Sequence, residues 1–228
     1  KVTKKLTHVH SHIKNDDIGD IIDIMVKDTI LITNQVLNEW VFKIFNVKTG
    51  EVICQCISKG KGPGEVLKPN LINEYNDMMF TTFDANRKEL IYFSYNGLCQ
   101  RDTNFLKYYK LEHHIFRAYP VNDSLVICNG IFEEGQFILI NMQSKKIIAT
   151  QNYPSIDKLN KFSNVTKGFI LQGEMALRPD HTEFVHVGNS AGVLEIGNIR
   201  DNLIKINLSK AYTIPKFYII GNAPVYPK

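Results

Sequence analysis

The sequence predicts an all-β protein, a β-propeller of four-stranded antiparallel blades. Three observations favour this fold. Short strand-like segments recur about every fifty residues, apolar and polar residues alternate within them, and glycine and proline punctuate the chain throughout. No window keeps the 3.6-residue apolar period of a helix, so little helix is expected.

The repeat is visible in two series of segments. In the first, a polar turn residue precedes alternating apolar residues, and the starts lie 49, 46 and 58 positions apart. In the second, a strand-like run ends in turn residues, and the starts lie 47, 48 and 56 positions apart. The segments are 28–33, 77–82, 123–128 and 181–186 in the first series, and 42–50, 89–97, 137–145 and 193–201 in the second. Two series that keep nearly the same step indicate a structural repeat.

Turn residues end these runs, as hairpins require. Thr49-Gly50 and Asn96-Gly97 are examples, and an Asn-Gly pair supplies the positive φ of a tight two-residue turn. We therefore expect a tight hairpin turn at Asn96-Gly97.

The repeat divides a single propeller domain, residues 1–228, into blades. The expected blades are about 15–70, 71–115, 116–165 and 166–212, with 213–228 as the opening of a further blade. One twisted sheet cannot bury both of its faces alone, so neighbouring blades must stack around an axis. A β-sandwich has no reason to repeat at this interval, and a solenoid usually repeats at about half this length or less.

One loop carries a family resemblance. The segment Gly60-Lys-Gly-Pro-Gly-Glu65 resembles the Gly-x-Gly-Pro-Gly-Glu loop of the TolB-like and NHL-like six-bladed propellers of bacterial cell envelopes. That family usually has an aromatic residue after the glutamate, where this chain has Val66. The segments 83–93 and 177–180 also fit the type.

The resemblance implies an exported protein of the periplasm or cell surface, often lipid-anchored. It also implies six blades, which need around three hundred residues. This chain of 228 residues is therefore expected to hold a partial ring, as a fragment, an open ring or a smaller one.

The Gly60–Glu65 loop has the composition of a structural turn. It lacks the Lys-Ser/Thr of a P-loop and the spacing of a dinucleotide fingerprint, and Pro69 discourages a following helix. We expect an inter-strand or inter-blade turn made by Gly60, Gly62, Pro63, Gly64 and Glu65, with Pro63 fixing φ.

Composition excludes several classes of partner. The chain carries 27 basic and 23 acidic residues, a net charge of +4, and its lysines are spread along the sequence rather than clustered as in nucleic-acid binders. No apolar stretch reaches the eighteen or so residues of a transmembrane helix. The chain begins at Lys1 without a signal peptide, so we expect a processed form.

The four cysteines suggest no metal or redox motif. They are Cys54, Cys56, Cys99 and Cys128, and none forms a C-x-x-C pair. Cys54 and Cys56 share one face of a predicted strand. We expect all four to be small buried residues rather than metal ligands or disulfide partners.

Polar turn residues are the candidates for a ligand-binding channel rim. Asp84, Asn86 and Arg87 lie between two strands of the second repeat, and Arg178 and Asp180 occupy what looks like a comparable turn in the fourth. Such loops gather at the ends of a propeller channel, where pockets form. The alternative is that the Asp and Asn side chains simply close their own backbone turns.

No catalytic constellation emerges. The segment 188–192 matches the G-x-S-x-G pattern of a nucleophile elbow around Ser190, but a strand is expected on both sides where the motif needs a following helix. His8, His10 and His12 alternate and could hold a transition metal if extended, yet no carboxylate or cysteine lies at a matching spacing. We expect no metal and no cofactor.

By elimination, the sequence favours a non-enzymatic binding or protein-interaction module of the cell envelope, with a protein, peptide or glycan ligand. The alternative is a metal-dependent propeller hydrolase or lyase with its site in the central channel, for which Asp23, Asp84 and Glu174 are the candidate acids by blade position. A third possibility is self-association through unclosed blade edges.

Overall fold

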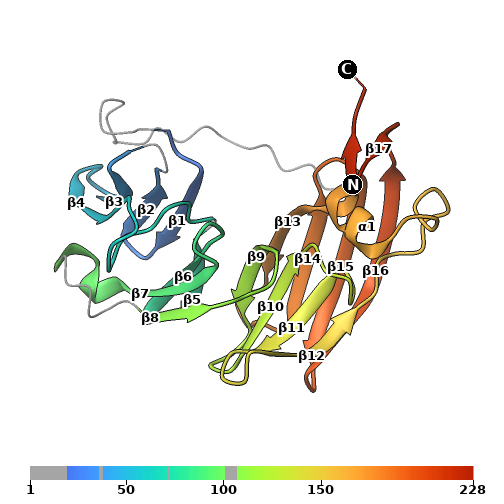
Figure 1. Ribbon diagram of the computed structural model, residues 1–228. Helices are drawn as coiled ribbons and strands as arrows, with labels where there is room; N and C mark the ends of the chain where they lie inside the picture. The colour runs from blue at the N-terminus through green and yellow to red at the C-terminus, as the bar shows by residue number, and fades with distance from the viewer. Residues whose placement is uncertain (1–19, 36–37, 71, 101–106, 228) are drawn as a thin grey trace, which may run out of the picture.

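The computed structural model describes residues 20–35, 38–70, 72–100 and 107–227, which form four four-stranded sheets and a C-terminal hairpin (Figure 1). In each four-stranded sheet the strands pair antiparallel in chain order, so each sheet is a simple meander. The predicted propeller-type fold of four-stranded antiparallel blades is confirmed.

The strands of the four sheets are as follows. The first sheet is β1 (Asp23–Lys27), β2 (Ile30–Asn34), β3 (Trp40–Asn46) and β4 (Val52–Ser58). The second is β5 (Asn73–Asn76), β6 (Met79–Asp84), β7 (Glu89–Ser94) and β8 (Lys107–Lys110). The third is β9 (Ile115–Pro120), β10 (Leu125–Gly130), β11 (Phe137–Asn141) and β12 (Lys146–Gln151). The fourth is β13 (Gly173–Leu177), β14 (Glu183–Gly188), β15 (Gly192–Arg200) and β16 (Leu203–Thr213), and the hairpin is β17 (Tyr218–Ile220) with β18 (Ala223–Val225).

The two series of repeating segments correspond to the two middle strands of each sheet. The first series gives β2, β6, β10 and β14, and the second gives β3, β7, β11 and β15. The sequence repeat is clearest in these strands because they carry much of the buried apolar surface. Examples with at most 2% exposure are Ile32, Phe80, Ile127 and Phe184.

Consecutive sheets pack face to face through shared hydrophobic clusters. The first and second sheets meet where the Phe42 ring of β3 contacts the Phe93 and Phe80 rings edge to face, with centroids 5.3 and 5.9 Å apart. The third and fourth meet at Phe137 and Phe184, whose rings contact edge to face at 5.0 Å. Each such buried aromatic contributes about 1.5–3 kcal/mol by leaving water.

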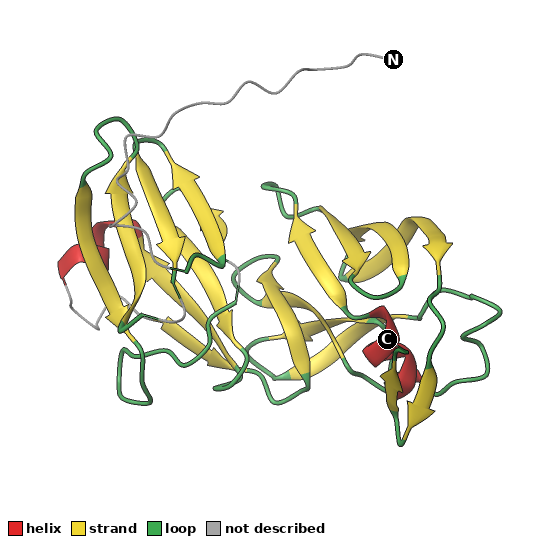
Figure 2. Cartoon of the chain, turned by 90° about the horizontal axis from the view of Figure 1, so that it is seen from above, coloured by secondary structure: helices red, strands yellow, loops and turns green. Residues whose placement is uncertain are grey.

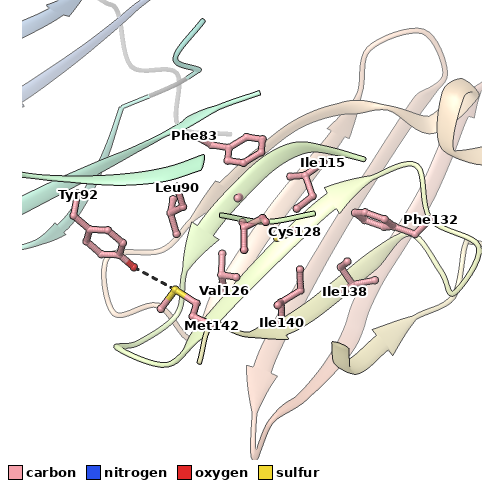
Figure 3. Packing of buried hydrophobic residues seen from close by; sticks show 12 residues of the cluster. Phe83, Leu90, Tyr92, Ile115, Val126, Cys128, Phe132, Ile138, Ile140 and Met142 are labelled. Atoms are coloured by element: carbon pink, nitrogen blue, oxygen red, sulfur yellow. Dashed lines mark hydrogen bonds between the residues drawn. The ribbon is translucent and has the colours of Figure 1, made fainter. Parts of the chain in front are cut away.

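The second and third sheets share a cluster of the same kind (Figure 3). Leu90 and Tyr92 of β7 face Val126 and Cys128 of β10, and the Tyr92 hydroxyl donates to the Met142 sulfur at 3.8 Å. Each pair of neighbouring sheets therefore shares a hydrophobic cluster of its own. The sheets do not close into a ring, which makes the described part of the chain a partial propeller.

Among the described residues, helix is confined to α1 (Asn164–Leu171) and the 3-10 helix η2 (Tyr95–Gln100). The helix α1 begins after Ser163, whose hydroxyl accepts a hydrogen bond from the Thr166 backbone N–H at 3.2 Å. It lies in the connection 152–172 between the third and fourth sheets, which explains why the last repeat step is the longest.

The hairpin turn expected at Asn96-Gly97 is wrong. These residues lie inside η2, and Gly97 has no positive φ, whereas Gly50 does, at 76°. The reason is the length of the connection: β7 ends at Ser94 and β8 begins only at Lys107, so no two-residue turn is needed.

The expectation that every cysteine would be free is also wrong. Cys54 of β4 forms a disulfide with Cys99 of η2, with the Cα atoms 5.6 Å apart, while Cys56 and Cys128 are free and buried. The bond joins the first and second sheets. The two cysteines lie 45 positions apart, and they meet only because η2 packs against β4.

Candidate functional site in the central channel

In a propeller the first strand of each blade faces the central axis, and here side chains link the first strands of neighbouring sheets. Side chains connect them directly: Lys27 of β1 reaches Glu74 of β5 at 2.6 Å, and the Tyr119 hydroxyl of β9 donates to the Met175 carbonyl of β13. Figure 2 shows the same sheets seen from above. Polar groups on these four strands form two clusters, one near the starts of the strands and one near their ends.

At the starts of the strands, charged groups from three sheets converge. Arg117 donates to both oxygens of Glu174, with Nε–Oε2 and Nη2–Oε1 distances of 2.8 and 2.5 Å. Asp23 Oδ2 accepts the Ile72 backbone N–H at 2.6 Å. Burial raises the pKa of Asp23 above its usual value, and the negative charge of Glu174 raises it further.

Asp23 and Glu174 are two of the three acids named above as channel candidates, and the negative charge of Glu174 acts on Asp23. Arg117 pairs with Glu174 and compensates part of this negative charge. Asp84 lies elsewhere. In the part of the chain that the structure describes, no three His, Cys, Asp or Glu side chains are grouped so that they could hold a metal ion.

At the ends of the strands lies a cavity of about 430 Å³. It is bounded by the second, third and fourth sheets, through β5, the last residues of β9 and β13, and the turns after β5 and β13. Its lining includes Asn73, Tyr75, Asp77, Tyr119, Arg178 and His181.

Aromatic rings form one wall of this cavity. The rings of Tyr75 and His181 lie with centroids 5.7 Å apart, and Tyr75 also meets Tyr92 edge to face at 5.2 Å. The Tyr75 hydroxyl donates to Asp123 Oδ1 at 2.6 Å. Burial, followed by this contact with Asp123, raises the pKa of Tyr75 well above its usual value, so the phenol is neutral. His181 Nδ1 lies 3.2 Å from the Val121 carbonyl oxygen, which can only accept, so Nδ1 carries a proton.

The charges on the cavity rim are paired within the protein. Lys27 lies 2.6 Å from Glu74 and 2.9 Å from Asp77. Arg178 Nε donates to Asp180 Oδ1 at 2.9 Å, and Arg178 Nη1 lies 2.6 Å from Glu183. The hydrogen bond from the Arg178 guanidinium holds the pKa of Asp180 well below its usual value. Aromatic rings thus form a wall of the cavity, and the charged side chains at its rim form ion pairs with one another.

The five residues proposed as a channel rim do not meet. Arg178 lines the 430 Å³ cavity, with Asp180 paired to it in the turn between β13 and β14. Asp84, Asn86 and Arg87 belong to the turn between β6 and β7, which lies at the opposite end of a meander sheet. The view that these turns are comparable is wrong, because one joins the first and second strands of its sheet and the other joins the second and third.

Asp84 is fully buried and bonds to backbone on both sides. Its Oδ2 accepts from the backbone N–H groups of Leu67 and Lys68 at 2.6 and 3.3 Å, and its Oδ1 accepts from those of Asn86 and Arg87, both at 3.1 Å. It therefore ties the chain entering the second sheet to the β6–β7 turn.

The loop Gly60–Glu65 connects the first sheet to the second and closes on itself. Glu65 Oε2 accepts the Gly62 backbone N–H at 2.6 Å, and Gly64 has a positive φ of 77°. Arg87 donates to the carbonyl oxygens of Gly62 and Glu65 at 3.2 and 2.7 Å. Pro63 lies between these contacts at the tip of the loop.

The two remaining sequence motifs are the G-x-S-x-G pattern and the three alternating histidines. The segment 188–192 joins strand β14 directly to strand β15, so no helix follows Ser190. His8, His10 and His12 lie outside the described residues.

The aromatic residues of the cavity were not identified from sequence. Tyr75 and Tyr119 precede the turn residues Asp77 and Asp123 by two and four positions, which places them at the ends of first strands. Both offsets are even, so aligning the repeats on those turn residues places the two side chains on the same face of the first strands.

Four stacked meander sheets with a polar channel make this chain an open β-propeller. It belongs to the TolB-like 6-blade propeller-like family, whose sequence profile matches residues 18–219. No curated protein matches the chain.

Similar solved structures share the fold at low identity. The Cps50 (Swd1) β-propeller domain of Myceliophteria thermophila is 13% identical, with a TM-score of 0.52 over 86% of this chain and 56% of that one. Hydrazine synthase of Kuenenia stuttgartiensis is 9% identical, with a TM-score of 0.52 over 92% of this chain and 53% of that one. An exported protein of Bacteroides fragilis NCTC 9343 is 15% identical, with a TM-score of 0.47 over 88% and 73%. The chain thus spans just over half the length of the first two.

None of the helices formed by the described residues has the length and apolar character of a membrane-spanning helix.

Proposed function

We propose that the protein is a non-enzymatic binding module of the bacterial cell envelope that takes part of a glycan or peptide into the 430 Å³ cavity. One observation carries this proposal: the Tyr75 and His181 rings form a wall beside charges that are already paired within the protein. The volume lies in the range of about 300–1,000 Å³ typical of ligand pockets.

The wall chemistry supports an uncharged ligand. The aromatic rings offer apolar faces on which a sugar ring or an apolar side chain can pack, and the tyrosine hydroxyl and asparagine groups can accept or donate hydrogen bonds. A charged ligand would have to displace Lys27 from Glu74 and Asp77, or Arg178 from Asp180.

The test is binding of a panel of neutral oligosaccharides and short peptides by saturation-transfer NMR. We expect Tyr75→Ala to abolish the signal of any hit and Tyr75→Phe, which keeps the ring, to retain most of it. Tyr212→Ala on the exposed strand β16 is the matched control. Hits that survive Tyr75→Ala and His181→Ala unchanged would place the ligand elsewhere.

The convergence of Asp23 and Glu174 at the other cluster favours a second candidate, a metal-dependent hydrolase or lyase. Such a site would need further oxygen ligands, since no three His, Cys, Asp or Glu side chains of the described residues are grouped there, and it would need Glu174 to be released from Arg117. Metal analysis after gentle purification tests it. Stoichiometric calcium or zinc that is lost in Glu174→Gln would support the enzyme, and metal-free protein that gains no affinity for either ion would exclude it.

Export from the cytoplasm is supported by the Cys54–Cys99 disulfide, because disulfides persist in oxidising compartments such as the periplasm or cell surface. Localisation of a tagged full-length chain in cell fractions tests this part of the proposal. A protein found only in the cytoplasm would contradict it.

We further propose self-association through the outward faces of the first and fourth sheets. Ile22, just before β1, is 49% exposed, and Ile24 and Val26 on β1 are 57% and 55% exposed. Val187 and Leu208 of the fourth sheet are 48% and 41% exposed. Such faces usually find a partner. Light scattering should show an oligomer that Ile24→Lys with Val187→Lys converts to a monomer. A monomeric wild-type chain would contradict this.

A further inference from the structure

The connection between the third and fourth sheets builds a second cavity, far from the channel contacts described above. Residues 152–163 run from β12 to α1, and the connector 214–217 runs from β16 to the C-terminal hairpin. The helix α1 packs beside β18, and Figure 2 shows both at one end of the molecule. Residues of the segments 157–162 and 214–217 line an open cavity of about 530 Å³.

The floor of this cavity is fixed by the core. Leu159 and Ile170 are fully buried in one hydrophobic cluster, against which Phe162 and Phe217 pack. Two backbone hydrogen bonds hold the turn, from Leu159 N–H to the Ile156 carbonyl at 2.7 Å and from Phe162 N–H to the Leu159 carbonyl at 3.0 Å. Because Leu159 is buried and these hydrogen bonds fix the turn around it, the residues on either side of Leu159 are held in place.

The rim is basic and the floor is aromatic. Lys158, Lys161 and Lys216 line the cavity, and Asp157 is the single acid in the lining. The rings of Phe162 and Phe217 lie with centroids 5.6 Å apart, and Lys161 Nζ lies 5.1 Å from the Phe162 centroid. Lys158 and Lys161 come from one segment and Lys216 from another, so basic side chains from two distant parts of the sequence converge at this cavity.

We propose that this cavity binds a ligand bearing a phosphate group. A phosphate carries close to two negative charges and several acceptor oxygens, which match a set of lysine ammonium groups. The apolar part of the ligand, a ring or an acyl chain, packs on Phe162 and Phe217. This site differs from the channel cavity, where the charges are already paired, and it does not depend on the function proposed for that cavity.

Titration with inorganic pyrophosphate by calorimetry, in about 0.02 M salt so that charges are weakly screened, tests the charge requirement. We expect saturable one-to-one binding to the full chain. The triple variant Lys158→Gln, Lys161→Gln, Lys216→Gln should bind at least about tenfold more weakly, since each ammonium contributes through its charge. A control triple variant, Lys146→Gln, Lys205→Gln, Lys210→Gln, removes the same charge from strands β12 and β16 and should bind as the wild type does.

Two further arms identify the source of the phosphate. Wild-type binding to phosphatidylglycerol vesicles but not phosphatidylcholine vesicles, lost in the first triple variant, would assign a lipid headgroup. Binding of pyrophosphate without vesicle binding would assign a free phosphorylated ligand, and Phe217→Leu should then weaken phenyl phosphate more than pyrophosphate. Equal pyrophosphate affinity in both triple variants, or no binding to the folded wild type up to about 10 mM, overturns the proposal.

Discussion

Glu65 occupies the space that a side chain at position 60 would need. A Cβ atom added to Gly60 would lie 1.9 Å from Glu65 Oε2, and the same oxygen accepts the Gly62 backbone N–H at 2.6 Å. The glycines of this loop thus make room for the glutamate that closes it. This is a physical reason for Gly60 and Glu65 to occur together.

That relationship predicts a non-additive pair of substitutions. Gly60→Ala should push the Glu65 carboxylate off the Gly62 N–H and cost about 1–2 kcal/mol of unfolding free energy, and Glu65→Ala should cost about the same. The double variant should lose little more unfolding free energy than either single variant, because the first substitution has already removed the hydrogen bond between Glu65 and the Gly62 N–H. Urea unfolding of the four proteins measures the cycle, and additive losses would refute the shared cause.

Asp84 should be the most sensitive of the turn residues. Asp84→Ala leaves four backbone N–H groups without their acceptor, so we expect a loss of roughly 2–4 kcal/mol in unfolding free energy, with Asp84→Asn intermediate. Asn86→Ala in the same turn is the control, with an expected change of about 0.5 kcal/mol or less. Equal effects of Asp84→Ala and Asn86→Ala would show that the buried carboxylate contributes nothing.

The disulfide should stabilise the junction between the first and second sheets. Cys99→Ser should lower the unfolding free energy by roughly 2–4 kcal/mol, since the bond closes a long loop of the unfolded chain. Peptide mapping under non-reducing conditions should recover Cys54 linked to Cys99. Cys128→Ala, at a free cysteine, is the comparison, and linkage of Cys56 instead of Cys54 would contradict the assignment.

Alkaline pH should destabilise the fold through Cys56. Burial raises the pKa of this thiol from 9.0 to about 12, so above pH 9 the unfolded chain loses a proton that the native chain keeps. The unfolded state then binds fewer protons, and stability falls by up to about 1.4 kcal/mol per pH unit as pH rises from 9 toward 12.

Unfolding free energies of wild type and Cys56→Ala between pH 8 and about 11 measure this effect. Cys56→Ala should give a shallower decline with pH. A decline of the same slope in both proteins would mean that Cys56 does not contribute to it.

The repeat was predictable because the middle strands of each sheet are both regular and buried. Phe80 and Phe184 occupy equivalent places in the sequence pattern and in the packed sheets. The family resemblance was likewise readable from one loop, and the profile match over residues 18–219 confirms it.

What could not be predicted depends on contacts between repeats. Cys99 meets Cys54 only because η2 folds back onto the preceding sheet. Tyr75 and His181 come from the second and fourth sheets and meet only because the sheets curve around the channel. Arg178 and Asp84 were grouped wrongly. Which end of a sheet a turn occupies depends on which two strands it joins, and a local sequence pattern does not show that.

The clusters at each sheet junction have a consequence for how the molecule comes apart. Every hydrophobic cluster between four-stranded sheets is shared by two neighbouring sheets. The second and third sheets are therefore packed on both faces, and the first and fourth sheets share such a cluster on one face only. Such a one-dimensional array loses its terminal units first. Amide protons of β2 and β3 should therefore exchange with deuterium sooner than those of β6, β7, β10 and β11, as fraying proceeds inward from the ends.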